Sequence, residues 1–286
     1  MGAAQRLAFY ASRLPLVEVT TTYRFPPTAE VARRWAATTP DGFTMDVQAW
    51  SLLTGAPTWP ESLWPDLRGE VRPSRRPGTK LYRHRLPGPV LDECWSRFVH
   101  ALRPLQGAGR MGAVVLRYPA WFAPRPQSWA ELAELAYHLD GLPGAVELTN
   151  DRWFAGDQCE RTLSFLEGVG LGFVCRDLPP PRRPVVAATS EWAFVRLPGR
   201  RRPGEAGPEA DGTWWSYRYS DAELGEWVPR VLELAGGTSQ VHLVMDNCWR
   251  GDGVDNAAGL LSLLAGAACD SGGPPGGGAV TGATGR

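Results

Sequence analysis

Lysine is almost absent from this sequence. Lys80 is the one lysine among 30 basic residues, and it lies in a stretch rich in proline and arginine. A Schiff-base lysine needs an activated amine, so we expect no covalent amine catalysis. Net charge is absent as well, because 30 acidic residues balance the basic ones. That balance argues against a nucleic-acid binder that works through global positive charge.

Cysteine pairs and long apolar runs are also missing. The five cysteines are an odd number, widely spaced and without a CxxC motif, so neither a disulfide framework nor a thiolate zinc site is indicated. No apolar run reaches the roughly 18 residues needed to cross a bilayer. The opening segment is amphipathic and lacks the apolar core of a signal peptide. We therefore expect a cytoplasmic protein that has no membrane partner.

Two hydrophobic periods alternate along the chain. Apolar residues at a spacing of three and four predict helices, and short apolar runs predict strands. The predicted helices are residues 3–13, 28–39, 91–105, 128–139, 158–169, 221–235 and 254–265. The predicted strands are residues 16–22, 43–48, 113–118, 145–149, 171–176, 192–197 and 241–246.

This alternation predicts an α/β fold, a TIM-type (β/α) barrel that is incomplete because seven of eight strands are found. The first helix has no strand before it. A doubly wound open sheet is the alternative, but no GxGxxG follows an early strand. We expect one barrel domain over residues 1–266 and a disordered glycine-rich tail over residues 267–286.

Active sites of such barrels lie at the carboxyl ends of the strands. The catalytic candidates there are Glu18, Glu147 and Asp246. The same strand ends and the loops after them supply polar and aromatic side chains that can bind a ligand. These candidates are Thr20, Thr22, Tyr23, Gln48, Arg117, Asn150, Trp153, Arg196 and Asn247. The alternative interpretation is a set of salt bridges that only tie the barrel together.

Histidine is too scarce for the metal sites that use several imidazoles. Of four histidines, only His84 falls in a loop expected near the strand ends. We therefore predict no metal and no other cofactor. A Mg²⁺ or Mn²⁺ ion held by carboxylates alone stays open as an alternative. Its candidate ligands are Glu18, Asp46, Glu147 and Asp246.

Aromatic and basic loops suggest the class of ligand. Eight of the 13 tryptophans lie in segments that follow strands, and residues 72–85 and 196–204 are basic stretches. Stacking rings and arginines favour a small polar or anionic ligand, or single-stranded nucleic acid. The alternative is that the indoles cover the core and that the arginines are solvated.

Several runs of residues resemble one known family. These are FYASRLPLVEVTTTYRFPPTAEVARRWAATTPDGFTMDV (9–47), VVLRYPAWF (114–122), AVELTNDRWF (145–154), FVRLPGR (194–200), YRYSDAELGEW (217–227) and HLVMDNCWRGDGVDNAAGLLSLL (242–264). In this order they are similar to the domain of unknown function 72 family, the YecE-like proteins. The resemblance implies a TIM-type barrel and a family without an established activity. It also implies a leading strand, which is missing here.

The resemblance is incomplete at the strand ends. Gln48 stands where the family usually has lysine, Arg117 where it has glutamine, and Pro198 where it has histidine. Thr149 and Asn150 replace an Arg-His pair. The residues that match are Glu18, Glu147, Arg196, Asn247 and Asn256. The acidic positions are thus present, while several basic and imidazole groups are not.

Two classes of function follow from the sequence. The first is an enzyme that acts on a polar or anionic, sugar- or nucleotide-like substrate by carboxylate acid/base or metal-assisted chemistry. The second is a non-catalytic module that binds a small ligand or single-stranded nucleic acid at the same place.

Overall fold

The computed structural model describes residues 2–71, 79–201, 216–270 and 279–284. They group into two compact units, Met1–Ser12 with Val19–Thr162 and Arg13–Glu18 with Leu163–Arg286. The expectation of a single domain over residues 1–266 stays a prediction.

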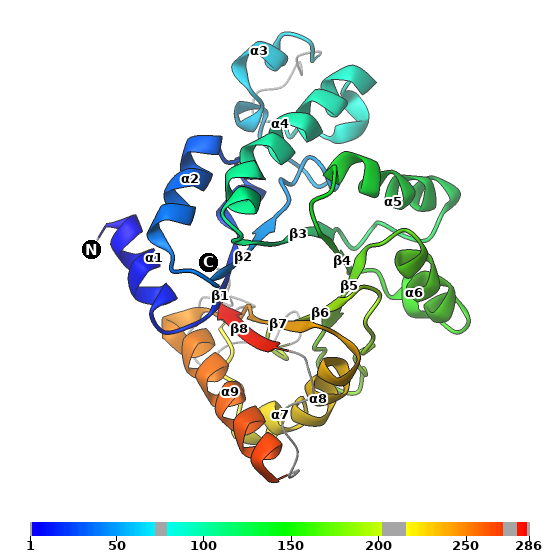
Figure 1. The fold of residues 1–286 in the computed structure, drawn as a ribbon. Helices are drawn as coiled ribbons and strands as arrows, with labels where there is room; N and C mark the ends of the chain where they lie inside the picture. Colours follow the sequence, from blue (N-terminus) through cyan, green and yellow to red (C-terminus); the bar gives the residue numbers. More distant parts are fainter. Residues whose placement is uncertain (1, 72–78, 202–215, 271–278, 285–286) are drawn as a thin grey trace. The chain divides into compact units, whose positions relative to one another are not determined.

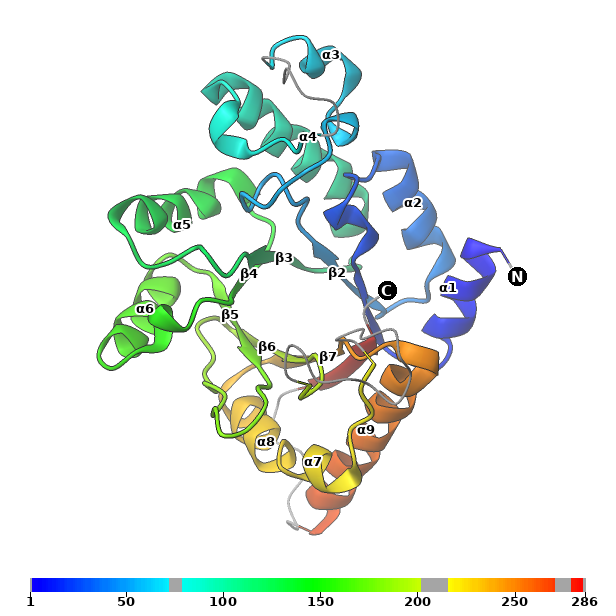
Figure 2. The same cartoon turned by 180° about the vertical axis from the view of Figure 1, so that it is seen from behind.

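The first unit is built on a parallel sheet covered by helices. β2 (Thr44–Gln48) pairs with β3 (Met111–Tyr118), and β3 pairs with β4 (Gly144–Leu148). Figures 1 and 2 show the larger helices of this unit along one face of these strands. The helices are α1 (Ala3–Ala11), α2 (Ala29–Thr38), α3 (Pro65–Arg68), α4 (Gly88–Gly107) and α5 (Pro126–Leu139).

The second unit repeats this arrangement. β5 (Gly172–Arg176), β6 (Trp192–Leu197), β7 (Gln240–Met245) and β8 (Ala279–Thr284) pair in parallel in this order. Its helices are α7 (Asp221–Gly225), α8 (Val228–Gly237) and α9 (Asp252–Asp270). β1 (Leu16–Val19) and α6 (Gln158–Gly168) have residues in both units.

Within each unit the strands pair in sequence order, β2–β3–β4 in the first unit and β5–β6–β7–β8 in the second. The seven predicted strands correspond to β1 to β7 and alternate with helices, which is the architecture of an incomplete TIM-type barrel. The predicted fold class is therefore confirmed. The strands are apolar on both faces because helices cover one face and the core lies on the other. Val114, Val115, Phe194 and Leu243, for example, are buried.

Two elements differ from the prediction. The helix expected over 221–235 is divided into α7 and α8, because Pro229 lacks a backbone N–H and fits only the first turn of a new helix. Within residues 267–286, where a disordered tail is expected, the structure describes parts of two elements. α9 continues to Asp270, and β8 lies inside the glycine-rich segment and pairs with β7. The segment's glycine-rich composition hides this strand.

Short 3-10 helices also follow several strands, where the sequence predicts only loops or strand ends. They are η1 (Thr21–Tyr23), η2 (Pro60–Ser62), η3 (Arg83–Arg85), η4 (Asp151–Phe154) and η5 (Trp249–Gly251). No helix in the described ranges has an apolar stretch that would reach across a membrane.

We expect the core of the sheet to dominate stability. Leu116 on β3 is fully buried, so Leu116→Ala should lower the free energy of unfolding by about 2–5 kcal/mol. Leu232 is 38% exposed, and Leu232→Ala should cost clearly less. Urea denaturation of both variants measures the difference, and equal losses would contradict the described burial.

Candidate functional site

Arg117 and Glu147 meet at the carboxyl ends of β3 and β4 in the first unit. The parallel register places their Cα atoms opposite each other, so both side chains leave the sheet on the same face. Arg117 Nε lies 3.3 Å from Glu147 Oε1. The Glu147 side chain is fully buried, whereas 27% of the Arg117 side chain is exposed. Arg117 therefore stands between a buried carboxylate and solvent.

Tyr23 adds a hydroxyl group near this pair. Burial raises the pKa of Tyr23, and the positive charge of Arg117 partly opposes that rise. The phenol is thus neutral near pH 7 and can donate a hydrogen bond. Thr22, its neighbour in η1, places its Oγ 2.9 Å from the Val19 carbonyl and 2.6 Å from the Gln48 carbonyl. That buried hydroxyl ties η1 to the end of β2.

Glu18 and Arg196 form a closer pair in the second unit. Arg196 Nη1 donates to Glu18 Oε2 at 2.6 Å, and Nη2 donates to Oε1 at 2.8 Å. Both side chains are almost completely buried, and Asp246 Oδ2 lies 3.8 Å from Arg196 Nη1. Two parallel charge-assisted bonds fix this geometry. Proton transfer by Glu18 therefore requires this pair to separate.

Asn247 follows β7 and holds the segment before α7. Its Nδ2 donates to the Tyr217 carbonyl and to Asn256 Oδ1, both at 2.8 Å. Asn256 in turn accepts a hydrogen bond from the Tyr219 N–H and donates one to the Tyr219 carbonyl. The Asn247 Oδ1 atom is buried and has no hydrogen-bond donor among the described residues. An unmatched buried acceptor is unusual, so Asn247 is one of the polar groups of this unit that a ligand could satisfy.

Sequence reasoning missed a buried network around Asp177, just after β5. Asp177 accepts hydrogen bonds from Arg200 Nε at 2.8 Å, Tyr219 Oη at 2.8 Å and Trp227 Nε1 at 3.0 Å. Arg200 also donates to Glu226. Burial, together with the charge of Asp177, raises the pKa of Tyr219. This network fixes the loop after β6. The position of Asp177 at a strand end was the available signal, but its partners come from distant segments.

Gly199 is part of the same loop and must be a glycine. Its backbone N–H donates to Tyr219 Oη at 2.8 Å, and its φ of +95° lies in a region that L residues rarely adopt. An added Cβ would lie 2.7 Å from Tyr217 Cβ. The close approach of Tyr217 and the positive φ thus both require glycine.

Three predicted ligand-binding residues have other surroundings than expected. Trp153 is fully buried and donates its indole N–H to the Phe122 carbonyl, and ligand binding by Trp153 stays a prediction. Asn150 uses Nδ2 on the Ala120 carbonyl and Oδ1 on the Arg152 N–H, which caps η4. Thr20 is half-buried and makes no side-chain cap. Gln48, a fourth predicted ligand-binding residue, is buried at the end of β2.

The tryptophans of the loops differ in exposure, and several loop arginines are paired. Trp59 and Trp121 are exposed at 47% and 58%, whereas Trp50 is buried. Residues 72–78 and 202–215, which include Trp214 and Trp215, lie outside the described residues. Two described arginines of the basic stretches have acidic partners: Arg83 contacts Glu131, and Arg200 contacts Asp177 and Glu226.

The carboxylates offer no ready metal cluster in the described ranges, where no three His, Cys, Asp or Glu side chains come together as a metal ion would need. Asp46, one of the four carboxylates considered, accepts a hydrogen bond from the Ala113 N–H at 2.8 Å. A carboxylate-bound Mg²⁺ or Mn²⁺ ion stays an untested alternative.

The buried Glu18–Arg196 pair predicts strong non-additivity. Arg196→Met should lower the free energy of unfolding by about 3–5 kcal/mol, because it leaves a buried carboxylate without its cation. The double variant Glu18→Gln with Arg196→Met should lose less than Arg196→Met alone. Chemical denaturation of the two single variants and the double variant tests this. Additive losses would show that the pair is not coupled.

Comparisons with known proteins agree with this architecture. A UPF0759 protein YunF from Bacillus subtilis (strain 168) is 27% identical over 273 residues, covering 92% of this chain and 88% of that protein. A crystal structure of a DUF72 family protein from Enterococcus faecalis V583 has a TM-score of 0.73 at 22% identity, with 92% and 94% of the two chains covered. One from Thermotoga maritima MSB8 has a TM-score of 0.69 at 22% identity, with 93% and 91% covered.

These structural likenesses show the fold alone. The family is shown by a sequence profile described as "Protein of unknown function DUF72", which matches residues 1–276. That match confirms the family resemblance found in the sequence. The chain belongs to the DUF72 family.

Proposed function

We propose that this protein is an enzyme that binds a small polar or anionic substrate, of sugar or nucleotide type, at the carboxyl ends of β3 and β4. The observation that carries the proposal is the contact between the part-exposed Arg117 and the fully buried Glu147. Arginine binds phosphate and carboxylate groups through its planar fork of donors. Arg117 is therefore the anion-binding group of the site.

Glu147 is the acid/base group of the proposed reaction. An anionic substrate that binds Arg117 competes with Glu147 for the guanidinium. A buried carboxylate that loses part of its cation takes up a proton more readily, because desolvation disfavours its charged form. Substrate binding then prepares Glu147 to accept a proton from the substrate. Tyr23, neutral near pH 7, donates a hydrogen bond to a substrate oxygen.

A non-catalytic binding module is the second candidate. The exposed indoles of Trp59 and Trp121 favour it, because aromatic rings that reach solvent can stack on sugars or bases without any chemistry. Lys80 Nζ lies over the Trp59 ring, 2.7 Å from its centroid. This contact adds a positive charge beside one stacking surface.

The experiment is a thermal-shift screen of sugar phosphates, sugar acids and nucleotides. A ligand at about one hundred times its dissociation constant should add about 2.7 kcal/mol of stability. Each ligand found is then assayed for turnover by mass spectrometry of the reaction mixture. The screen separates a binder from an enzyme, because a module would bind without forming product.

Three variants assign the roles. Arg117→Met should weaken binding of the anionic ligand about tenfold or more, since a charge-assisted hydrogen bond contributes about 1.5–3 kcal/mol. Glu147→Gln should keep binding within a few fold and abolish turnover. Arg34→Met is the matched control, because 67% of that side chain is exposed on α2 and its ion-pair partner is Glu30, which is not a residue of the site. Unchanged binding in Arg117→Met rejects the proposed site.

A further inference from the structure

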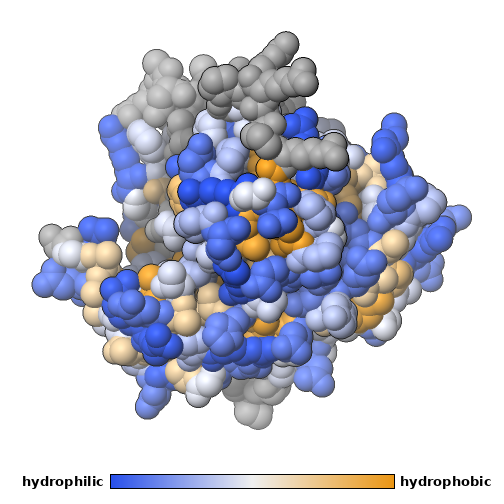
Figure 3. Space-filling view, turned by 90° about the horizontal axis from the view of Figure 1, so that it is seen from above, coloured by the Kyte–Doolittle hydropathy of each residue, from blue (hydrophilic) through white to orange (hydrophobic). Residues whose placement is uncertain are grey.

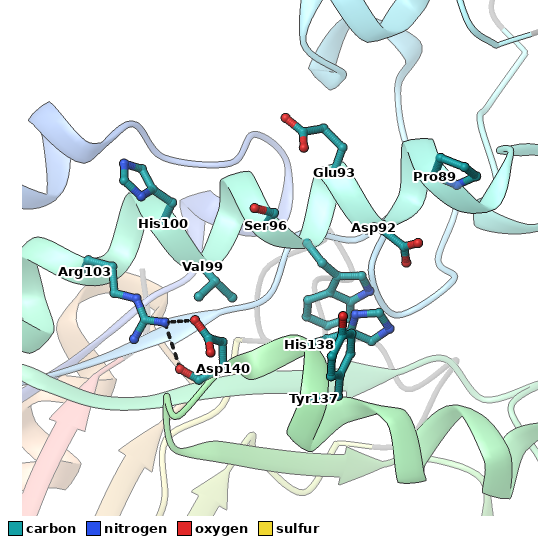
Figure 4. Close-up of a pocket in the computed structure, with 11 residues that line it drawn as sticks. Pro89, Asp92, Glu93, Ser96, Val99, His100, Arg103, Tyr137, His138 and Asp140 are labelled. Carbon is teal, nitrogen blue, oxygen red and sulfur yellow. Dashed lines mark hydrogen bonds and ion pairs between the residues drawn. The ribbon is translucent and has the colours of Figure 1, made fainter.

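A groove between α4 and α5 lies apart from the strand ends, on the helix layer of the first unit (Figure 4). Its volume is about 610 Å³, and it extends along α4 from Pro89 to Arg103. At 1.5 Å of rise per residue, this is a length of about 21 Å. The end of α5, with Tyr137 and His138, forms the other wall. The groove is therefore long rather than round.

Trp95 lines the groove and leaves one polar group unmatched. Its side chain is 2% exposed and stacks on the His138 ring, with centroids 4.9 Å apart and an angle of 7°. The indole Nε1–H is buried and has no hydrogen-bond acceptor among the described residues. A buried donor without an acceptor costs about 1–3 kcal/mol. A ligand oxygen that reached this nitrogen, as the rim side chains adjust, would recover that cost.

Asp92 makes the groove negative. Glu93 pairs with Arg97, and Asp140 pairs with Arg103, so these charges are balanced within the protein. Asp92 has no ion-pair partner in the described part of the chain.

Two imidazoles, His100 and His138, also line the groove. His100 is exposed on α4 and has no acidic partner in the described ranges. Burial lowers the pKa of His138, although Asp92 and Glu134 oppose the shift, and Arg83 adds to it. His138 is therefore neutral near pH 7. Among the described residues that line the groove, Asp92 is then the carboxylate without an arginine partner.

Tyr137 completes a surface suited to a cation. Its side chain is 83% exposed, and its ring meets His138 edge-on at 5.6 Å. Figure 4 shows Asp92, Tyr137 and His138 toward the Pro89 end of the groove, and Arg103 with Asp140 at the other end. An exposed aromatic ring near a carboxylate attracts guanidinium and ammonium groups.

Seen from above, on the side of α3 and α4, hydrophobic patches lie among hydrophilic side chains (Figure 3).

We propose that the α4–α5 groove binds an extended peptide segment with an arginine or lysine side chain, supplied by a partner protein. An extended chain rises about 3.3 Å per residue, so about six residues span the groove. The basic side chain lies on Tyr137 and pairs with Asp92. A peptide carbonyl accepts the hydrogen bond of Trp95 Nε1. A free metal ion or a small amine would neither span the groove nor accept a hydrogen bond from Trp95 Nε1.

The test uses synthetic capped hexapeptides of alanine and serine, with one arginine at each position in turn. The full chain is labelled with ¹⁵N-tryptophan, and Trp95→Phe identifies the indole signal of Trp95. We expect the arginine peptides to shift that signal downfield with saturable binding. Asp92→Asn and Tyr137→Ala should each weaken binding about two- to fivefold, as expected for exposed ion pairs and cation–π contacts.

Matched controls make the outcome decisive. Asp157→Asn, an exposed acidic position before α6, should leave binding unchanged. A peptide with norleucine in place of arginine should bind more weakly. The proposal is overturned if the norleucine peptide binds equally well, if Asp92→Asn has no effect, or if no arginine peptide moves the Trp95 signal at millimolar concentration. Circular dichroism of the exposed-site variants Asp92→Asn and Tyr137→Ala confirms that they fold.

Discussion

Charge buried at the ends of strands is the constraint on which both units depend. A guanidinium or carboxylate placed among apolar strands is costly unless an opposite charge meets it. In the first unit Arg117 meets Glu147, and in the second Arg196 meets Glu18. The parallel register supplies the first pair directly, since the two residues face each other across β3 and β4. Burial raises the pKa of the neighbouring Tyr23, and the charge of Arg117 partly opposes that rise.

The two pairs differ in what they leave for chemistry. Glu18 accepts two short hydrogen bonds from one guanidinium, and both partners are buried, so this pair resembles a structural clamp. Arg117 touches Glu147 through Nε and keeps part of its side chain in solvent. A ligand can reach the second arrangement without breaking a bidentate bond. The difference explains why acid/base chemistry is assigned to Glu147, although the sequence presents the two glutamates as equivalent.

The positions of the strands were predictable, whereas the surroundings of several side chains were not. The run WAFVRL is apolar enough to place β6 at the predicted residues. Trp153 follows a strand in the sequence, where a side chain can be either exposed or buried. In the structure its ring packs into the core against Phe122 and Trp129. The network of Asp177 was not predictable, because Arg200 and Trp227 are 23 and 50 residues away along the chain. Periodicity reports which face of an element is apolar, not which distant side chain meets it.

The sequence by itself determined the α/β class, the order of elements and the family, because each depends on local apolar periods and on runs of matching residues. It also placed Glu147 and Arg117 at strand ends. Only the tertiary structure decided which charges are paired, which indoles are exposed, and that Trp95 and Asp92 border a groove between α4 and α5. Burial and hydrogen-bond partners arise when elements pack together, and no single segment carries that information.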